Sequence, residues 1–284
     1  MNRLHLLAFI IIANLSFVGC SSLFYHPSKA LFVDPLRLNL HPEDIYFSSK
    51  TGKRLHGWYF KANQNPPKGL AVHFHGNAQN LSAHYLFLRE ATDKGFDYFI
   101  FDYEGYGQSE GTPSPGNLIL DGVSALEWAR AKSPALPIII FAQSLGGNVA
   151  INSLTEFLKM DSRPSSIKAL VIDSSFASYR SAARKVVSRH LLTWILQPVA
   201  WLIVDNSGSA DGKIEKVSPI PVLIIHGEKD NVVDFSLGQR LFDQAREPKE
   251  MWTIPNGGHT DFLSRPDWNR RFFEKLDFYL KAND

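Results

Sequence analysis

Short apolar runs alternate with segments of helical pattern along most of the chain. Six short runs of mainly apolar residues occur at 70–74, 98–101, 138–141, 169–172, 222–225 and 251–254. Helical spacing is found at 82–94, 118–132, in the segment after residue 144, and at 235–247 and 266–281. Short apolar runs between helices are typical of parallel strands that are buried on both faces. The pattern predicts an α/β fold whose mostly parallel sheet is doubly wound, with the functional loops at the carboxyl ends of the strands.

Two segments flank this alternation. Runs at 44–48 and 55–61 predict two strands joined at Thr51-Gly52, after a polar lead-in at 20–43 that is interrupted by prolines. We therefore expect one domain at 44–284. Within it, residues 177–214 contain no strand pattern but several apolar stretches, which predicts a small helical cap. Two interpretations of its apolar side chains remain open: they line a slot above the active site, or they pack the cap onto the body. The residues concerned are Trp194, Leu196, Trp201 and Leu202.

The N-terminus has the pattern of a secretory signal. A charged start with Arg3 precedes an almost unbroken apolar run at 6–18, which is shorter than a comfortable bilayer span. Cys20, the only cysteine, follows directly, and the segment resembles a bacterial lipoprotein signal at 1–19 with lipid on Cys20. A plain cleaved signal or an uncleaved anchor is the alternative. We expect a lipid-anchored protein of the cell envelope, with the outer membrane favoured by Ser21, or otherwise a periplasmic or secreted protein.

Composition excludes several classes of function. The chain has 284 residues, 44% of them hydrophobic and 20% charged, and a formal net charge of +2. This is ordinary globular composition without a strong field of one sign, and no basic stripe indicates binding of nucleic acid. No metal-ligand spacing occurs, and a single cysteine allows no internal disulfide bond.

The segment at 138–151 carries the strongest chemical signal. An apolar strand leads into Ala142, Gln143 and Ser144, and the chain then enters a helix at once. A serine on such a tight turn needs small neighbours, and Ala142 and Gly146 supply them. The turn exposes the hydroxyl and points the helix N-terminus at it, which favours a developing oxyanion. The pattern predicts that Ser144 is a nucleophile.

A serine hydroxyl needs a base, and the expected chain order on such a sheet is Ser, acid, His. Asp230 follows the strand run at 222–225, and His259 follows the run at 251–254. Both are expected at the edge that carries Ser144, with His259 as the general base and Asp230 as the acid that orients it. Alternatives for the acid are Glu228, Asp234 and Asp173, the last because it also follows a strand.

Two backbone N–H groups are needed for an oxyanion hole. Leu145, directly after the nucleophile, supplies one, and Asn77 in the loop after the run at 70–74 is expected to supply the other, with Gly76 allowing close approach. We expect His75 to be a structural hydrogen-bonding residue. The remaining histidines are assigned no catalytic role: His73 and His226 are expected to be satisfied core residues, and His84 and His190 lack a partner pattern.

These motifs together resemble the Bem46/ABHD13-type branch of the α/β-hydrolases. The resemblance rests on the segment 75–80, on 102–111 with its Asp-Tyr-Glu-Gly-Tyr-Gly sequence, on 144–147 and on the loops of Asp230 and His259. It implies a Ser144, Asp230 and His259 triad, no cofactor and hydrolysis of an acyl ester or thioester. A small-molecule or lipid-like acyl substrate is the expected partner. A peptidase or amidase with the same triad, and a lipid-anchored protein that binds without turnover, are the alternatives.

Overall fold

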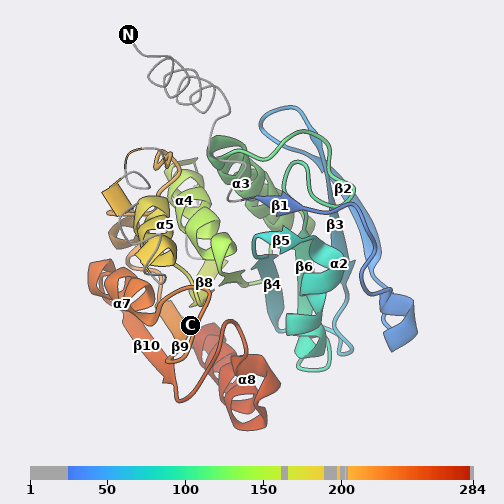
Figure 1. Ribbon diagram of the computed structural model, residues 1–284. Coiled ribbons are helices and arrows are strands. Elements are labelled where there is room, and N and C mark those ends of the chain that lie inside the picture. The colour runs from blue at the N-terminus through green and yellow to red at the C-terminus, as the bar shows by residue number, and fades with distance from the viewer. Residues whose placement is uncertain (1–24, 161–165, 189–196, 199–201, 203, 282–284) are drawn as a thin grey trace.

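A sheet of eight strands forms the centre of the molecule (Figure 1). The computed structural model describes residues 25–160, 166–188, 197–198, 202 and 204–281. The strands of this sheet are β2 (Glu43–Ser48), β3 (Arg54–Phe60), β4 (Gly69–Phe74), β6 (Phe96–Phe101), β7 (Ile138–Gln143), β8 (Ile167–Asp173), β9 (Val222–Gly227) and β10 (Lys249–Ile254). The eight strands overlap the six apolar runs and the two runs at 44–48 and 55–61, and the predicted α/β-hydrolase fold is confirmed.

The strand order is β10-β9-β8-β7-β4-β6-β3-β2, so β4 and β7 lie at the centre. Strands β2 and β3 form an antiparallel hairpin, and β3 is also antiparallel to β6. The pairs from β6 to β10 are parallel. Because parallel strands end at the same edge, the loops after β4, β6, β7, β8, β9 and β10 all lie at one edge of the sheet.

Helices cover both faces of the sheet. On one face lie α3 (Pro115–Lys132), α4 (Leu145–Met160) and α7 (Phe235–Gln244); on the other lie α2 (Leu81–His84), η3 (Tyr85–Ala91) and α8 (Pro266–Lys281). Side chains alternate between the two cores along each central strand. In β7, for example, Ile138 and Ile140 belong to the first core, whereas Ile139 and Phe141 belong to the second.

The predicted helix at 82–94 is not one α-helix. The structure has the short α2 followed by the 3-10 helix η3, with a break at Leu88. The buried side chains Tyr85, Leu88 and Ala91 are spaced by three residues, and this spacing matches the three residues per turn of a 3-10 helix. The segment ends at Gly95, whose φ of +90° is in the left-handed region.

Two features of the lead-in and cap complete the fold. Strand β1 (His26–Pro27) pairs in parallel with β5 (Ala78–Gln79) in a small sheet of its own, and η2 (Pro35–Leu38) follows it. After β8 the chain forms α5 (Tyr179–Ser188), and η6 (Ile214–Val217) precedes β9. Residues 189–196, 199–201 and 203 of the predicted cap lie outside the described residues, as does the whole predicted signal. The division into signal, lead-in and capped domain therefore stays a prediction.

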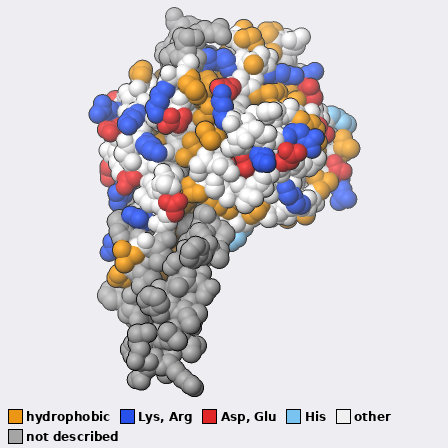
Figure 2. All heavy atoms as spheres, turned by 90° about the horizontal axis from the view of Figure 1, so that it is seen from above, with side chains coloured by type: hydrophobic (Ala, Val, Ile, Leu, Met, Phe, Trp, Pro, Cys, Tyr) orange, Lys and Arg blue, Asp and Glu red, His pale blue; other side chains and the backbone are white. Residues whose placement is uncertain are grey.

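Among the described residues, no helix is both long and apolar enough to cross a bilayer. On the face shown in Figure 2, lysine and arginine side chains are interspersed with aspartate and glutamate. This distribution agrees with the small formal net charge of +2.

Candidate active site

Ser144 occupies a strained turn between β7 and α4. Its φ is 52°, in the left-handed region that non-glycine residues rarely adopt. Its N–H donates to Asp173 O at 2.8 Å, and its carbonyl oxygen accepts from Ser175 Oγ at 2.6 Å. The end of β8 thus holds both sides of the Ser144 backbone. This geometry is that of the nucleophile elbow predicted from the sequence.

Gly146, two residues after the serine, has to be small for a steric reason. A Cβ at Gly146 would lie 2.2 Å from Phe74 O and 2.5 Å from His75 O, so only glycine allows α4 to approach the end of β4 this closely. Before the serine, Ala142 is buried and pairs with Phe74 and Ile172 of the neighbouring strands. The tight passage from strand to helix therefore depends on both small residues.

Asp230 and His259 are joined by a hydrogen bond. His259 Nδ1 lies 2.8 Å from Asp230 Oδ2, and the histidine side chain is 19% exposed. The other carboxylate oxygen of Asp230 accepts from the N–H groups of Val232 and Val233, each at 2.8 Å. Burial opposes the charge of Asp230, but the hydrogen bonds from His259 and the two backbone groups outweigh it and lower the pKa of this carboxyl. A charged Asp230 orients the imidazole with Nδ1–H toward the carboxylate.

Hydrogen bonds connect the loop of His259 to the serine turn. Thr260, next to His259, has a φ of 52°, and its N–H donates to Ser174 Oγ at 3.1 Å. Ser174 in turn donates to Asp173 Oδ1 at 3.1 Å, and Asp173 O holds the N–H of Ser144. The structure thus brings the three predicted triad residues to one edge of the sheet, on the loops after β7, β9 and β10.

The alternative acids are engaged elsewhere. Asp173 is buried and contacts Gln143 Nε2 and Ser174 Oγ, and burial raises the pKa of its carboxyl to about 7. Glu228 accepts from the N–H of Asn256, and Asp234 caps α7 and pairs with Lys185. Of the four candidates considered from the sequence, Asp230 is the one whose carboxylate accepts the hydrogen bond from His259.

The two predicted oxyanion-hole residues flank the serine. Leu145 is the first residue of α4, so its N–H has no acceptor one turn earlier in the helix. Asn77 lies in the loop after β4, and a Cβ at the neighbouring Gly76 would lie 3.7 Å from Ser144 Cβ. The carbonyl oxygen of Asn77 accepts from Tyr106 Oη at 2.7 Å. The loop that carries Asn77 is therefore close to Ser144 and held in place.

His75 holds the peptide group that contains the Asn77 N–H. Its Nδ1 lies 2.8 Å from Gly76 O, and because this carbonyl and the Asn77 N–H point to opposite sides of one trans peptide, the bond fixes where the N–H points. His75 Nε2 lies 3.3 Å from Asp102 Oδ1, which also accepts from Leu81 N at 2.8 Å. The expected structural role of His75 is thus matched by its contacts.

The other histidines have ordinary packing contacts. His73 is fully buried and contacts Tyr98 Oη at 2.8 Å and Gln143 Oε1 at 3.0 Å, as expected of a satisfied core residue. His226 Nε2 contacts Val233 O at 2.9 Å, but its buried Nδ1 has no partner among the described residues, so it is satisfied at one nitrogen only. His84 Nε2 contacts Ala78 O at 2.9 Å, which the sequence did not indicate. His190 lies outside the described residues.

A groove of about 430 Å³ runs beside these loops. It begins at Gln79, two residues from Asn77, and at Thr260, next to His259. Its apolar lining comes from Leu86, Phe87 and Leu263. Polar and charged side chains, among them Arg89, Glu90 and Asn269, line the rest of the groove.

Some predicted site residues cannot be placed. Cys20, Trp194, Leu196 and Trp201 lie outside the described residues, and Leu202 is described and strongly exposed. Conversely, the sequence reasoning missed the roles of Ser174 and Ser175, whose hydroxyls fix the His259 loop and the serine turn. Both residues directly follow β8, but their partners lie on other loops, at Thr260 and Ser144.

The family model described as serine aminopeptidase, S33, matches residues 65–212. An uncharacterized protein, YfhR, of Escherichia coli (strain K12) is 34% identical over 265 residues, which are 91% of this chain and 87% of that protein. The lysophosphatidylserine lipase ABHD12 of Danio rerio is 30% identical over 217 residues, 72% of this chain and 53% of that protein.

Solved structures show the same fold. The Pyrococcus furiosus esterase Pf2001 superposes with a TM-score of 0.68 at 21% identity, covering 90% of this chain and 98% of that one. The narrower resemblance to the Bem46/ABHD13-type branch stays a prediction. The family match and the extent of the similarity to YfhR show that the chain belongs to the serine aminopeptidase S33 family, within the α/β-hydrolase superfamily of serine hydrolases and esterases.

Proposed function

We propose that this protein hydrolyses carboxylic esters or thioesters of acyl groups through an acyl-enzyme on Ser144. The observation that carries the proposal is the hydrogen bond of His259 Nδ1 to the charged Asp230, on loops tied to the strained turn of Ser144. This bond leaves Nε2 as the nitrogen that takes up a proton.

In the first half of the reaction, Ser144 Oγ attacks the acyl carbon and its proton passes to His259 Nε2. Asp230 stabilises the imidazolium that forms. The carbonyl oxygen becomes an oxyanion and accepts hydrogen bonds from the N–H groups of Leu145 and Asn77. When the tetrahedral intermediate collapses, the bond to the alcohol or thiol breaks, and the leaving group takes the proton from His259.

In the second half, water replaces the leaving group. His259 takes a proton from this water while the water oxygen attacks the acyl carbon. Collapse of the second tetrahedral intermediate releases the carboxylic acid, and the proton returns from His259 to Ser144 Oγ. The cycle regenerates the free enzyme and uses no group beyond the chain and water.

An acyl substrate of lipid-like character suits the surroundings of the triad. Leu86, Phe87 and Leu263 give the groove next to Thr260 an apolar part that suits a hydrocarbon chain, and the similar protein ABHD12 is named a lysophosphatidylserine lipase. The pattern around Cys20 supports the further proposal that the protein is lipid-anchored in the cell envelope.

A substrate panel tests this proposal. Purified protein is assayed on p-nitrophenyl esters of increasing chain length, on acyl thioesters and on aminoacyl amides, with Ser144→Ala as the control. We expect turnover of esters or thioesters that Ser144→Ala lacks. Because the family description names an aminopeptidase, faster turnover of the amides would assign the triad to peptide substrates instead. Equal rates for both proteins would refute hydrolysis by Ser144.

A further inference from the structure

The first described residues are fastened to the loops of the candidate active site. His26 N donates to Asn77 Oδ1 at 3.2 Å, and Ser28 N donates to Gln79 O at 3.0 Å. Ser28 O accepts from Gly107 N and from Asn80 Nδ2. These bonds fix the segment that begins at Tyr25, so the chain cannot move away from this edge without breaking them.

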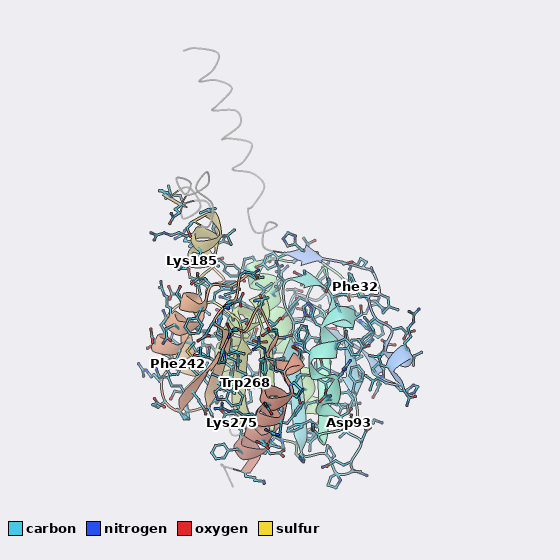
Figure 3. The ribbon with its side chains drawn as sticks, turned by 60° about the horizontal axis from the view of Figure 1, so that its bottom comes forward. Phe32, Asp93, Lys185, Phe242, Trp268 and Lys275 are labelled. Carbon is cyan, nitrogen blue, oxygen red and sulfur yellow. The ribbon has the colours of Figure 1, made fainter. Side chains whose placement is uncertain are left out.

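The fastened segment lies between the oxyanion loop and the start of the cap. Tyr25 is buried, and its Oη donates to Tyr179 Oη at 3.3 Å, the first residue of α5. Figure 3 shows β1, near the labelled Phe32, and α5, with Lys185, at the same end of the molecule, whereas Trp268 and Lys275 of α8 lie toward the other end. A membrane anchor upstream of Tyr25 would therefore be attached at the active-site end.

The number of residues between an anchor and Tyr25 limits the distance of Tyr25 from that anchor. Five residue steps separate Cys20 from Tyr25. Even a fully extended chain spans only about 3.3–3.6 Å per residue, so a lipid on Cys20 is at most about 18 Å from Tyr25. If the apolar run that ends at Val18 is the anchor instead, seven steps give about 25 Å. Either anchor keeps the active-site end close to a bilayer surface.

Exposed apolar side chains lie at this end. Leu31 and Phe32 follow the fastened segment, and Phe32 N donates to Ser82 Oγ, just after β5. Val232 lies in the loop of Asp230, and Val186 lies in α5 next to Lys185. Apolar side chains beside basic ones are the composition that inserts into the headgroup region of anionic membranes.

We propose that the edge of the sheet carrying Ser144 faces a lipid bilayer, with Leu31, Phe32, Val186 and Val232 in contact with it, so that acyl substrates reach the triad from the membrane. The substrate part of this inference rests on the proposed function, whereas the orientation rests on the fastened N-terminal segment and its short tether.

A pair of matched double variants tests the orientation. Leu31 and Phe32 are 63% and 42% exposed, and Leu36 and Leu38 of η2 are 60% and 41% exposed. Figure 3 shows η2, in pale blue, on the flank and not at the active-site end. The full chain is reconstituted in vesicles of phosphatidylethanolamine and phosphatidylglycerol, and turnover of p-nitrophenyl palmitate in the vesicles is divided by turnover of soluble p-nitrophenyl acetate.

We expect Leu31→Glu with Phe32→Glu to lower this ratio about tenfold, because carboxylates replace apolar area worth about 1.4 kcal/mol or more of membrane contact. Leu36→Glu with Leu38→Glu should leave the ratio unchanged. A ratio that falls equally in both double variants, or in neither, would overturn the proposed orientation.

A fluorescence measurement reads the orientation without any turnover. Leu31→Cys and Leu36→Cys variants are labelled with a nitrobenzoxadiazole fluorophore, and the wild-type chain treated in the same way gives the background from Cys20, the only natural cysteine. Nitroxide-bearing lipids in the vesicles should quench the label at residue 31 and not at residue 36. Equal quenching, or stronger quenching at residue 36, would overturn the proposal even if the enzyme is active. Stronger quenching at residue 31 would support it even if no ester is hydrolysed.

Discussion

At the scale of single residues, the Gly76-Asn77 peptide group shows how buried side chains prepare the site. His75 Nδ1 holds the carbonyl of Gly76, and Tyr106 Oη holds the next carbonyl, that of Asn77. Asp102 lies behind His75, where burial opposes its charge, but contacts with His56 and His75 and the N–H of Leu81 lower its pKa. These groups hold the peptide group that carries the predicted oxyanion donor, the N–H of Asn77.

Replacement of His75 by asparagine or by glutamine tests the roles of its two ring nitrogens separately. An asparagine places an N–H donor near the position of Nδ1, whereas a glutamine places one near Nε2. We expect His75→Gln and His75→Ala to lower kcat by about 10²-fold with little change in KM, as for loss of an oxyanion donor, and His75→Asn to keep most activity. Steady-state kinetics on a short p-nitrophenyl ester provide the measurement. A Gln variant as active as the wild type would show that Gly76 O needs no donor from residue 75.

Asp173 gives a pH dependence of stability. Burial raises the pKa of its carboxyl from an ordinary 3.8 to about 7 in the folded protein. The folded state thus holds a proton that the unfolded state has lost between about pH 4 and pH 7, so this contribution to stability is full below about pH 4 and is lost as pH rises through about 7.

Asp173→Asn resembles the protonated form at every pH. We expect its free energy of unfolding, relative to that of the wild type, to increase by on the order of 2 kcal/mol between about pH 5 and about pH 8. Urea denaturation of both proteins at the two pH values measures this difference. A difference that stays constant with pH would mean that Asp173 is already charged in the folded state at the lower pH.

The main site residues could be predicted because local sequence signals mark them. Ser144 lies between a strand run and a helix, and Asp230 and His259 directly follow strand runs. The hydroxyls of Ser174 and Ser175 escaped prediction because their partners lie on other loops: Ser175 contacts Ser144, 31 positions earlier, and Ser174 contacts Thr260, 86 positions later. Contacts of this kind leave no pattern in the local sequence.

At the scale of elements, the strands were the easiest to predict. A central strand such as β7 is buried on both faces and must be apolar throughout, so its sequence is recognised without knowledge of its neighbours. Helix α8 was predicted with the observed bounds because Phe272, Phe273 and Leu276 recur at helical spacing and form its buried face. These apolar positions in the sequence are among the positions of the helix that are buried in the structure.

Elements that depend on distant partners were missed. Strand β1 has two residues, and its pairing with β5 unites segments about 50 positions apart, so nothing in residues 26–27 predicts it. The lead-in was expected as a polar approach to the domain, but its hydrogen bonds to Asn77 and Gly107 make it part of the active-site edge. The split between α2 and η3 was missed because a three-residue spacing of apolar residues resembles a helical one.

At the scale of the whole molecule, the proposed function depends on several loops that lie together at one edge of the sheet. The predicted triad residues come from the loops after β7, β9 and β10, and the loop of Asn77 follows β4. Residues as far apart in sequence as Asn77 and His259 therefore lie at a single edge of the sheet. The parallel sheet makes this convergence possible, because it places the carboxyl ends of all these strands together. The described N-terminal segment, from Tyr25 to Ser28, is fastened at the same end by its hydrogen bonds to Asn77 and Gln79.

The most direct test of the account is covalent labelling of the folded protein with a fluorophosphonate, followed by mass spectrometry of the labelled peptide. We predict one adduct on Ser144 in the wild type, its loss in His259→Ala, and its retention in Asp173→Asn, since Asp230 is the acid that holds the histidine. Absence of an adduct on Ser144 in folded wild-type protein, or undiminished labelling of His259→Ala, would contradict the claim that these residues act as one nucleophilic unit.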